Sequence, residues 1–177
     1  MATTTTLDSM LELPAVDERL VAPESRYEIV DGTVVYMPPA GESHGASHGL
    51  LVAIVHAHRA DAYALALHML TRTSQLDDIA PDVSVYPSAR DPATGGRYIE
   101  DLAFEIVNTE SLAYAGIKAA KLVARGVRRV FAIDLDRACA LEWSKDRGEW
   151  SLLDRRTQIE DPALAVPIPV AALLAVP

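Results

Sequence analysis

The sequence contains very little cysteine: Cys139 is the only one, so the chain cannot form an internal disulfide. A chain without disulfides suits a reducing compartment. It also lacks an apolar run long enough to span a bilayer, and no basic stretch leads into an apolar segment at its N-terminus. We therefore expect a cytoplasmic protein with no membrane partner, and not a disulfide-stabilised secreted scaffold.

Basic residues are also scarce. The chain has 16 Lys and Arg against 25 Asp and Glu, which gives a formal net charge of -9. Proteins that hold nucleic acid mainly by neutralising phosphates are usually basic, so the charge argues against such a partner. Part of the acidity can be local, because a carboxylate metal site is acidic until its cation binds. Hydrophobic residues are plentiful, at 50% of 177 residues, and predict a folded chain with a sizeable core.

Two parts are expected along the chain. Residues 1–23 contain a short helix, LDSMLEL, which Pro14 would stop, and then a linker. Residues 24–177 are expected to form a single domain. This domain begins with a hairpin, RYEIV-DG-TVVYM, in which Asp31 and Gly32 supply the turn because they tolerate positive φ.

The rest of the domain alternates helices and strands. We expect a helix over 43–59, strands over 64–70, 82–87 and 101–107, a helix over 111–125, a strand over 127–136 and a hairpin over 140–154. Helical spacing puts four residues on one side of the first helix: His44, His48, Leu51 and Val55. The second helix, ended by Gly126, has four on its apolar face: Ala113, Ile117, Ala120 and Ala124. The tail from Pro162 should wrap the surface. This order indicates an α/β fold with a mixed β-sheet flanked by helices and with N-terminal and C-terminal hairpins.

Two acidic residues stand out by their positions in predicted strands. Asp82 opens a short strand after Pro81, and Glu105 lies inside the apolar run LAFEIV. A buried carboxylate needs a cationic partner, which here could be a metal ion, Lys118 or both. Mg²⁺ prefers oxygen ligands, so Asp82, Glu105 and the backbone carbonyl of Ile106 could bind it. The alternative is structural: Asp82 caps a turn and Glu105 pairs with an arginine.

The order of several short motifs resembles a known family. The series YEIVDG, APDVSV, AFEIVNTES, IKAAK and RGVRRVFAIDLD, over about Tyr27 to Asp136, is similar to the Uma-type family of restriction-endonuclease-like proteins. The tail IPVAALLA also resembles the family's ending. That family belongs to the PD-(D/E)XK nuclease superfamily, so the resemblance implies a restriction-endonuclease-like fold and metal-dependent cleavage of DNA.

The resemblance implies a role for each matching residue. Asp82 would be the first metal ligand and Glu105 the second acid. Lys118 occupies the position of the family's lysine on the helix that follows, where it would orient water and stabilise developing charge. Glu28 matches the acid of the first hairpin and could hold a second cation or a water. His44 matches a histidine near the start of the first helix.

The sequence also departs from the family pattern. Val107 stands where the superfamily's short signature has its lysine, and Asn108-Thr109 replaces the common Ser-Pro. Tyr114 and Leu122 replace the usual aspartate and tyrosine of the lysine-bearing helix, and Val130-Phe131 replaces Tyr-Trp. The acid and lysine positions of the metal site are kept. The departures lie around these positions, so they put the rate and the substrate in doubt.

Other groups of residues have simpler interpretations. His44 and His48 lie one helical turn apart, but a zinc protease pattern would need a glutamate after the first histidine, where Gly45 stands. His56, His58 and His68 are expected in ordinary surface or core positions. A basic group could contact phosphate or could simply be a solvated helix end: Lys121, Arg125, Arg128 and Arg129. Lys121 could substitute for Lys118. Trp143 and Trp150 are expected to pack against each other across a hairpin.

Three functions remain open. The first is an endonuclease that uses Mg²⁺ or Mn²⁺ to hydrolyse DNA phosphodiester bonds. The second is a non-catalytic module that keeps the nuclease fold to bind nucleic acid or protein. The third is a metal-dependent hydrolase of another phosphate ester. Paired nucleases cut two strands through symmetry, so the resemblance also makes a homodimer an expectation.

Overall fold

The computed structural model describes residues 26–37, 42–107 and 112–175. The helix and linker expected within residues 1–23 lie outside this range. None of the helices in the described residues is both long and apolar enough to cross a membrane.

A four-stranded sheet in the order β2-β1-β5-β4 forms one end of the molecule. Strands β1 (Arg26–Val30) and β2 (Thr33–Met37) pair as an antiparallel hairpin. Asp31 and Gly32 form its turn with φ of 51° and 75°, which confirms the predicted hairpin. Strands β4 (Thr71–Ser74) and β5 (Asp77–Ile79) complete the sheet. They are too short and too polar to stand out in the sequence.

A six-stranded mixed sheet in the order β10-β9-β8-β7-β6-β3 forms the centre. Its strands are β3 (Tyr63–Leu67), β6 (Val83–Pro87), β7 (Leu102–Val107), β8 (Arg129–Asp134), β9 (Cys139–Ser144) and β10 (Glu149–Leu152). Only β7 and β8 pair in parallel. All six residues of β7 are buried, as expected of an apolar strand covered on both faces.

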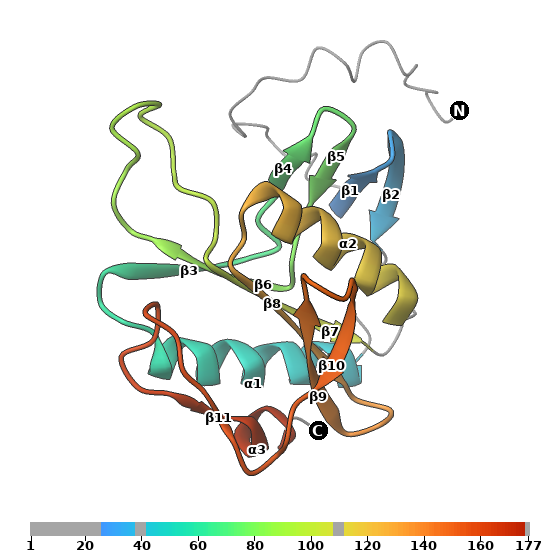
Figure 1. The fold of residues 1–177 in the computed structure, drawn as a ribbon, viewed down its shortest axis with the longest axis vertical. Coiled ribbons are helices and arrows are strands. Elements are labelled where there is room, and N and C mark those ends of the chain that lie inside the picture. Colours follow the sequence, from blue (N-terminus) through green and yellow to red (C-terminus); the bar gives the residue numbers. More distant parts are fainter. Residues whose placement is uncertain (1–25, 38–41, 108–111, 176–177) are drawn as a thin grey trace.

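The two long helices lie on opposite sides of this sheet (Figure 1). Helix α1 (Glu42–His58) packs Leu51 and Val55 against β7, and both side chains are fully buried. Helix α2 (Leu112–Arg125) connects β7 to β8 and packs Leu122 on the other face. Residues of β7 therefore alternate: Phe104 faces α1, and Glu105 faces α2. This arrangement confirms the predicted α/β class.

The inner face of α2 differs from the prediction. The residues expected to be buried are exposed: Ala113, Ile117, Ala120 and Ala124. The buried face instead carries Leu122, Val123 and Lys118. The prediction was wrong because both faces of the helix carry apolar residues, and the buried face is the one on which Lys118 meets carboxylates from other elements.

The C-terminal tail contributes to the core. It forms β11 (Gln158–Ile159), β12 (Ile168–Pro169) and the short helix α3 (Val170–Leu173). Ile168, Val170 and Leu173 are fully buried in the cluster that also contains Leu51 of α1. The expectation that the tail only wraps the surface was therefore wrong, because its apolar residues fill the space beside α1.

Candidate active site at the start of β6

The two predicted acids lie opposite each other at one end of β6 and β7. Val83 pairs with Phe104 in antiparallel register, so the next pair outward is Asp82 with Glu105. Asp82 Oδ2 accepts a hydrogen bond of 2.8 Å from the Ile106 N–H. The Glu105 side chain turns toward α2 and is 2% exposed. Each acid is the centre of its own cluster of side chains, and β7 joins the two clusters.

Glu105 belongs to a buried cluster of three charges, the Glu28–Lys118–Glu105 triad. Lys118 Nζ lies 3.1 Å from Glu105 Oε2 and 3.3 Å from Glu28 Oε1. Glu28 comes from β1 and also accepts a hydrogen bond of 2.7 Å from the Ala80 N–H. Three elements, β1, β7 and α2, therefore meet at Lys118. The sequence analysis proposed each of these residues for the site, and the structure brings them together.

The helix that carries Lys118 lies close to the β9–β10 hairpin. Gly116 faces this hairpin, and a Cβ there would lie 3.0 Å from the Trp143 ring and 3.3 Å from Trp150 Nε1. The two tryptophans pack edge to face, with ring centroids 5.2 Å apart, as the sequence predicted for cross-strand partners. Trp150 Nε1 also donates a hydrogen bond of 3.1 Å to the Leu112 carbonyl. The hairpin thus fixes the start of the helix that carries Lys118.

Asp82 belongs to a second cluster with two histidines. Its Oδ1 lies 3.8 Å from His48 Nε2 and 3.6 Å from His68 Nδ1. The imidazole rings of His48 and His68 stack, with centroids 4.6 Å apart and planes inclined by 6°. His44 also stacks on His48, with centroids 6.2 Å apart. Asp82 is therefore held by the backbone through one oxygen and faces imidazole nitrogens with the other.

The backbone of β7 adds an oxygen on the same side. Both polar groups of a strand residue point to the same neighbour, and successive residues alternate. The Val107 carbonyl accepts a hydrogen bond from the Leu135 N–H on the β8 side. The Ile106 N–H points to Asp82, and the Ile106 carbonyl accordingly points to the Asp82 side as well. On this side the Ile106 carbonyl could contribute an oxygen ligand to a metal ion at Asp82, as the sequence analysis predicted.

His68 occupies an unusual backbone position. It follows β3 with φ of 48°, a left-handed conformation that histidine adopts more readily than most residues. Burial lowers the pKa of its imidazole from 6.5 to about 4, and the charge of Arg26 adds to this effect. The Asp82 carboxylate acts in the opposite direction. The ring is therefore neutral near pH 7, and Arg26 Nη1 donates a hydrogen bond to its Nε2.

The histidine cluster was missed by the sequence analysis. Among the residues that the structure describes, one group of at least three potential ligands comes close enough to share an ion: His48, His68 and Asp82. A signal for His48 existed, because it shares a helical face with the buried Leu51 and Val55. Nothing in the sequence marks His68, since its position depends on the turn after β3.

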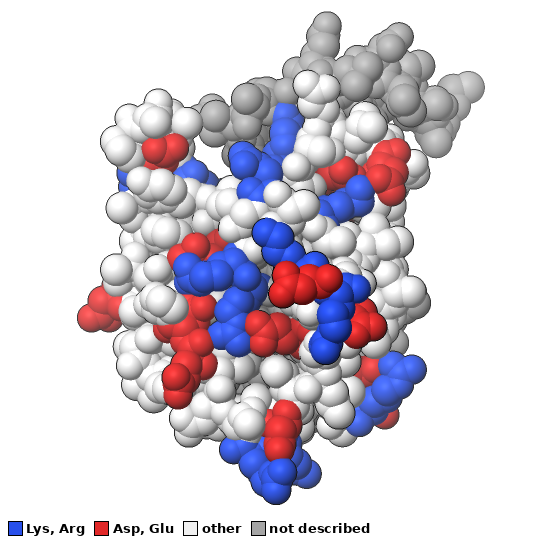
Figure 2. Space-filling model, viewed as in Figure 1, with Lys and Arg blue, Asp and Glu red and all other residues white. Residues whose placement is uncertain are grey.

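The basic residues near Lys118 are mostly engaged elsewhere. Lys121 lies 2.6 Å from Asp31 and 2.9 Å from Asp77, so it ties the first hairpin to β5 and not to the triad. Other ion pairs join Arg128 to Asp161 and Asp101, and Arg129 to Glu142. Figure 2 shows blue and red side chains interleaved over the face in view, without a broad area of one sign. Of the two interpretations of this basic group, the pairing favours a solvated helix end.

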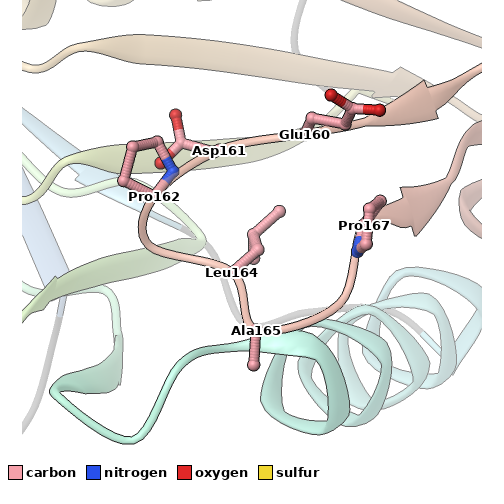
Figure 3. Close-up of a pocket in the computed structure, with 6 residues that line it drawn as sticks. All are labelled: Glu160, Asp161, Pro162, Leu164, Ala165 and Pro167. Carbon is pink, nitrogen blue, oxygen red and sulfur yellow. The ribbon is translucent and has the colours of Figure 1, made fainter.

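A surface hollow lies apart from both clusters. It is formed by the segment between β11 and β12 beside α1 (Figure 3), and its lining residues are Glu160, Asp161, Pro162, Leu164, Ala165 and Pro167. None of the predicted site residues lines it. Asp161 is occupied by Arg128, and the Glu160 carbonyl accepts a hydrogen bond from Arg129.

Comparisons with known proteins bear on the family and the fold of the chain. The chain matches the Uma2 family, described as putative restriction endonuclease, over residues 7–174. Its structure is similar to the crystal structure of a putative nuclease belonging to DUF820 from Anabaena variabilis ATCC 29413. The two share 18% sequence identity with a TM-score of 0.72, over 97% of this chain and 98% of that one. This likeness confirms the predicted restriction-endonuclease-like fold. No curated protein matches the chain.

Proposed function

Because the chain belongs to the Uma2 family of putative restriction endonucleases, we propose that it is a divalent-metal-dependent endonuclease that hydrolyses DNA phosphodiester bonds. One observation carries the proposal: Lys118, from a helix, lies buried between the carboxylates of Glu28 and Glu105, directly beside the strand that binds Asp82. A buried lysine held between two acids, with a third acid bound to the backbone of the same strand, suits phosphodiester chemistry.

The donor set fits a divalent cation such as Mg²⁺ or Mn²⁺. Asp82 Oδ1, the Ile106 carbonyl and Glu105 offer oxygen atoms from two neighbouring strands, and carboxylates with a backbone carbonyl are typical ligands of these ions. When bound, the ion would polarise the phosphate and lower the pKa of a water. The backbone N–H of Ile106 fixes the orientation of the Asp82 carboxylate, since it binds Oδ2 and leaves Oδ1 facing His48 and His68.

The triad has a separate task in this proposal. Lys118 holds Glu105 in place through a contact of 3.1 Å and brings a positive charge toward a scissile phosphate. Glu28 holds Lys118 from the other side, and the Ala80 N–H fixes Glu28 in turn. Such a chain of contacts keeps the lysine oriented before substrate arrives, which lowers the cost of ordering it during the reaction. Within this proposal, His44 and Lys121 play at most an accessory part.

The test is cleavage of plasmid and of single-stranded DNA while Mg²⁺ or Mn²⁺ is titrated. Asp82→Ala is measured alongside, with Asp146→Ala as the control because Asp146 is an exposed residue of the β9–β10 turn. We expect cleavage that requires the metal, vanishes in Asp82→Ala and persists in the control. Metal-dependent cleavage by Asp82→Ala at the wild-type rate would contradict the assignment.

A non-catalytic binding module is the second candidate. The ion pairs of Lys121, Arg128 and Arg129 favour its protein-binding form, because they leave few of these charges for phosphate contact. In that case the chain would bind its partner without cutting either DNA substrate at any metal concentration. A homodimer remains part of the proposal for the endonuclease, and light scattering of the purified chain tests it.

A further inference from the structure

We propose that His48, His68 and Asp82 form a site for a first-row transition-metal ion with mixed nitrogen and oxygen ligands. The proposal rests on the assignment of Asp82 as a metal ligand, and it changes the ion that this residue would bind. A site with two imidazoles prefers Mn²⁺, Co²⁺ or Zn²⁺ to Mg²⁺. The cluster would therefore set the metal preference of the protein.

The distances suit one shared ion. Donor atoms about 2.1 Å from the same ion in tetrahedral geometry lie roughly 3–4 Å apart. Asp82 Oδ1 lies 3.6 Å from His68 Nδ1 and 3.8 Å from His48 Nε2. The three donor atoms all lie within 4.8 Å of one another. The two imidazole planes are stacked and inclined by only 6°, so one ring has to rotate before both nitrogen lone pairs point at the same ion.

The cluster is held in place before any ion binds. Before any ion binds, the Asp82 carbonyl accepts hydrogen bonds from His48 Nε2 at 3.0 Å and from the His68 backbone N–H at 3.4 Å. An ion at His48 Nε2 would replace the first of these bonds and move the ring proton of His48 to Nδ1. Helix α1 fixes His48, since Leu51 and Val55 of the same face are fully buried against the sheet. The Ile106 N–H fixes the carboxylate. Three separate segments are thus tied to one residue, which reduces the ordering cost of binding.

The ligand chemistry separates the candidate ions. Mg²⁺ takes oxygen ligands and loses its water reluctantly, so it gains little from imidazole. Imidazole suits transition metals, and affinity rises from Mn²⁺ through Co²⁺ to the later ions. The triad offers no nitrogen ligand except a charged lysine, so the histidines decide the preference. The oxygen atoms of Glu105 and of the Ile106 carbonyl do not by themselves distinguish these ions.

Arg26 opposes binding at this site. It donates a hydrogen bond to His68 Nε2, which places the ring proton on Nδ1, the atom that faces Asp82. An ion at Nδ1 would move this proton to Nε2, where the guanidinium could no longer donate. Arg26 also brings a positive charge next to the cluster. Its removal should therefore strengthen metal binding.

The experiment measures Co²⁺ and Mg²⁺ binding to the full chain without DNA. Visible absorption reports Co²⁺ ligation, and calorimetry gives the affinity of each ion. The variants are His48→Gln, His68→Gln and Arg26→Met, with His56→Gln as the matched control because His56 is exposed on the same helix. Circular dichroism checks that each variant is folded. Paramagnetically shifted imidazole protons in the Co²⁺-loaded wild type give a reading that requires no variant.

We expect Co²⁺ to bind at least about tenfold more tightly than Mg²⁺, and each of His48→Gln and His68→Gln to lower the Co²⁺ affinity by about tenfold or more. Mg²⁺ affinity should change little in these variants, the control should bind as the wild type does, and Arg26→Met should bind Co²⁺ more tightly. Equal binding of Co²⁺ and Mg²⁺, histidine variants that bind Co²⁺ as the wild type does, or no shifted imidazole protons would overturn the proposal.

The test of the histidine metal site can be distinguished from the test of the proposed nuclease activity. If Co²⁺ binds through the histidines but no DNA is cut, the metal site stands and the endonuclease proposal fails. If Mg²⁺ supports cleavage but Co²⁺ binding does not depend on His48 or His68, the endonuclease proposal stands and the histidine site fails.

Discussion

At the scale of single residues, Lys118 has the most demanding environment. Its side chain is 2% exposed, and it contacts Glu28 and Glu105, whose carboxylates are buried as well. Burying a charge is costly unless opposite charges compensate it, so each member of the triad depends on the others. The same contacts that would orient Lys118 for chemistry therefore also contribute to folding.

Replacing Lys118 with Met should consequently destabilise the protein. We expect a loss of about 3–5 kcal/mol in the free energy of unfolding, because two carboxylates remain buried without the ammonium. Adding Glu105→Gln to Lys118→Met should recover part of the loss, since it removes one of these charges. Urea unfolding measures each variant, with Lys145→Met as the control at an exposed turn. A loss no larger than in the control would contradict the role of the triad.

Asp77 gives a second prediction, on pH dependence. Burial raises the pKa of its carboxyl, but the Ser74 hydroxyl, the Asp31 N–H and Lys121 together outweigh this effect, so the pKa lies below its ordinary value. A carboxylate with a lowered folded-state pKa stabilises the fold above the unfolded-state pKa, and this stability is lost as pH falls through the folded-state pKa.

Asp77→Asn should thus be less stable than the wild type at pH 7, and the difference should shrink as pH falls below about 4. Urea unfolding at pH 7, 5 and 3 measures the slope, and Asp61→Asn at an exposed turn serves as the control. The idea fails if the wild type and Asp77→Asn lose stability in parallel over this range.

At the scale of elements, the sequence predicted what depends on local patterns. The Asp31-Gly32 turn, the apolar run of β7 and the end of α2 at Gly126 follow from local conformation and burial. The inner face of α2 could not be predicted, because both faces are apolar and the choice depends on partners of Lys118 from β1 and β7. The paired positions of Asp82 and Glu105 were predictable from two strands. His68 was not, because a turn of positive φ brings it to Asp82.

The contact between α2 and the β9–β10 hairpin can be tested at Gly116. A Cβ there would crowd the Trp143 and Trp150 rings, which are fixed against each other and against the start of α2. We expect Gly116→Ala to destabilise the protein by about 1–3 kcal/mol, despite the higher helix propensity of alanine. Gly49→Ala on α1 is the matched control, since a Cβ there meets nothing within 4 Å. It should stabilise by about 0.5–1 kcal/mol. Stabilisation by Gly116→Ala would show that the hairpin can move to make room for the added Cβ.

At the scale of the whole molecule, charge is the property that bears most on DNA binding. The net charge of -9 was evident from composition, but the sequence could not show how the cations are distributed. Within the part of the chain that the structure describes, Lys121, Arg128 and Arg129 lie in ion pairs, whereas the Arg125 side chain donates a hydrogen bond to a backbone carbonyl. A cation in an ion pair has to separate from its carboxylate before it can neutralise a phosphate. The molecule should therefore hold DNA through few phosphate contacts.

The salt dependence of DNA binding tests this expectation. A protein with 6–10 phosphate contacts shows a slope of log affinity against log salt of about -5 to -9, and we expect a magnitude below about 4 here. Fluorescence anisotropy in EDTA measures the slope without cleavage. Arg125→Gln should reduce its magnitude by about 0.9, the contribution of one phosphate contact, whereas Arg128→Gln should leave it unchanged because Asp161 already holds that side chain. A slope of -6 or steeper, or an equal effect of both variants, would mean that these ion pairs open when DNA binds. The acidic composition would then say little about the surface that binds nucleic acid.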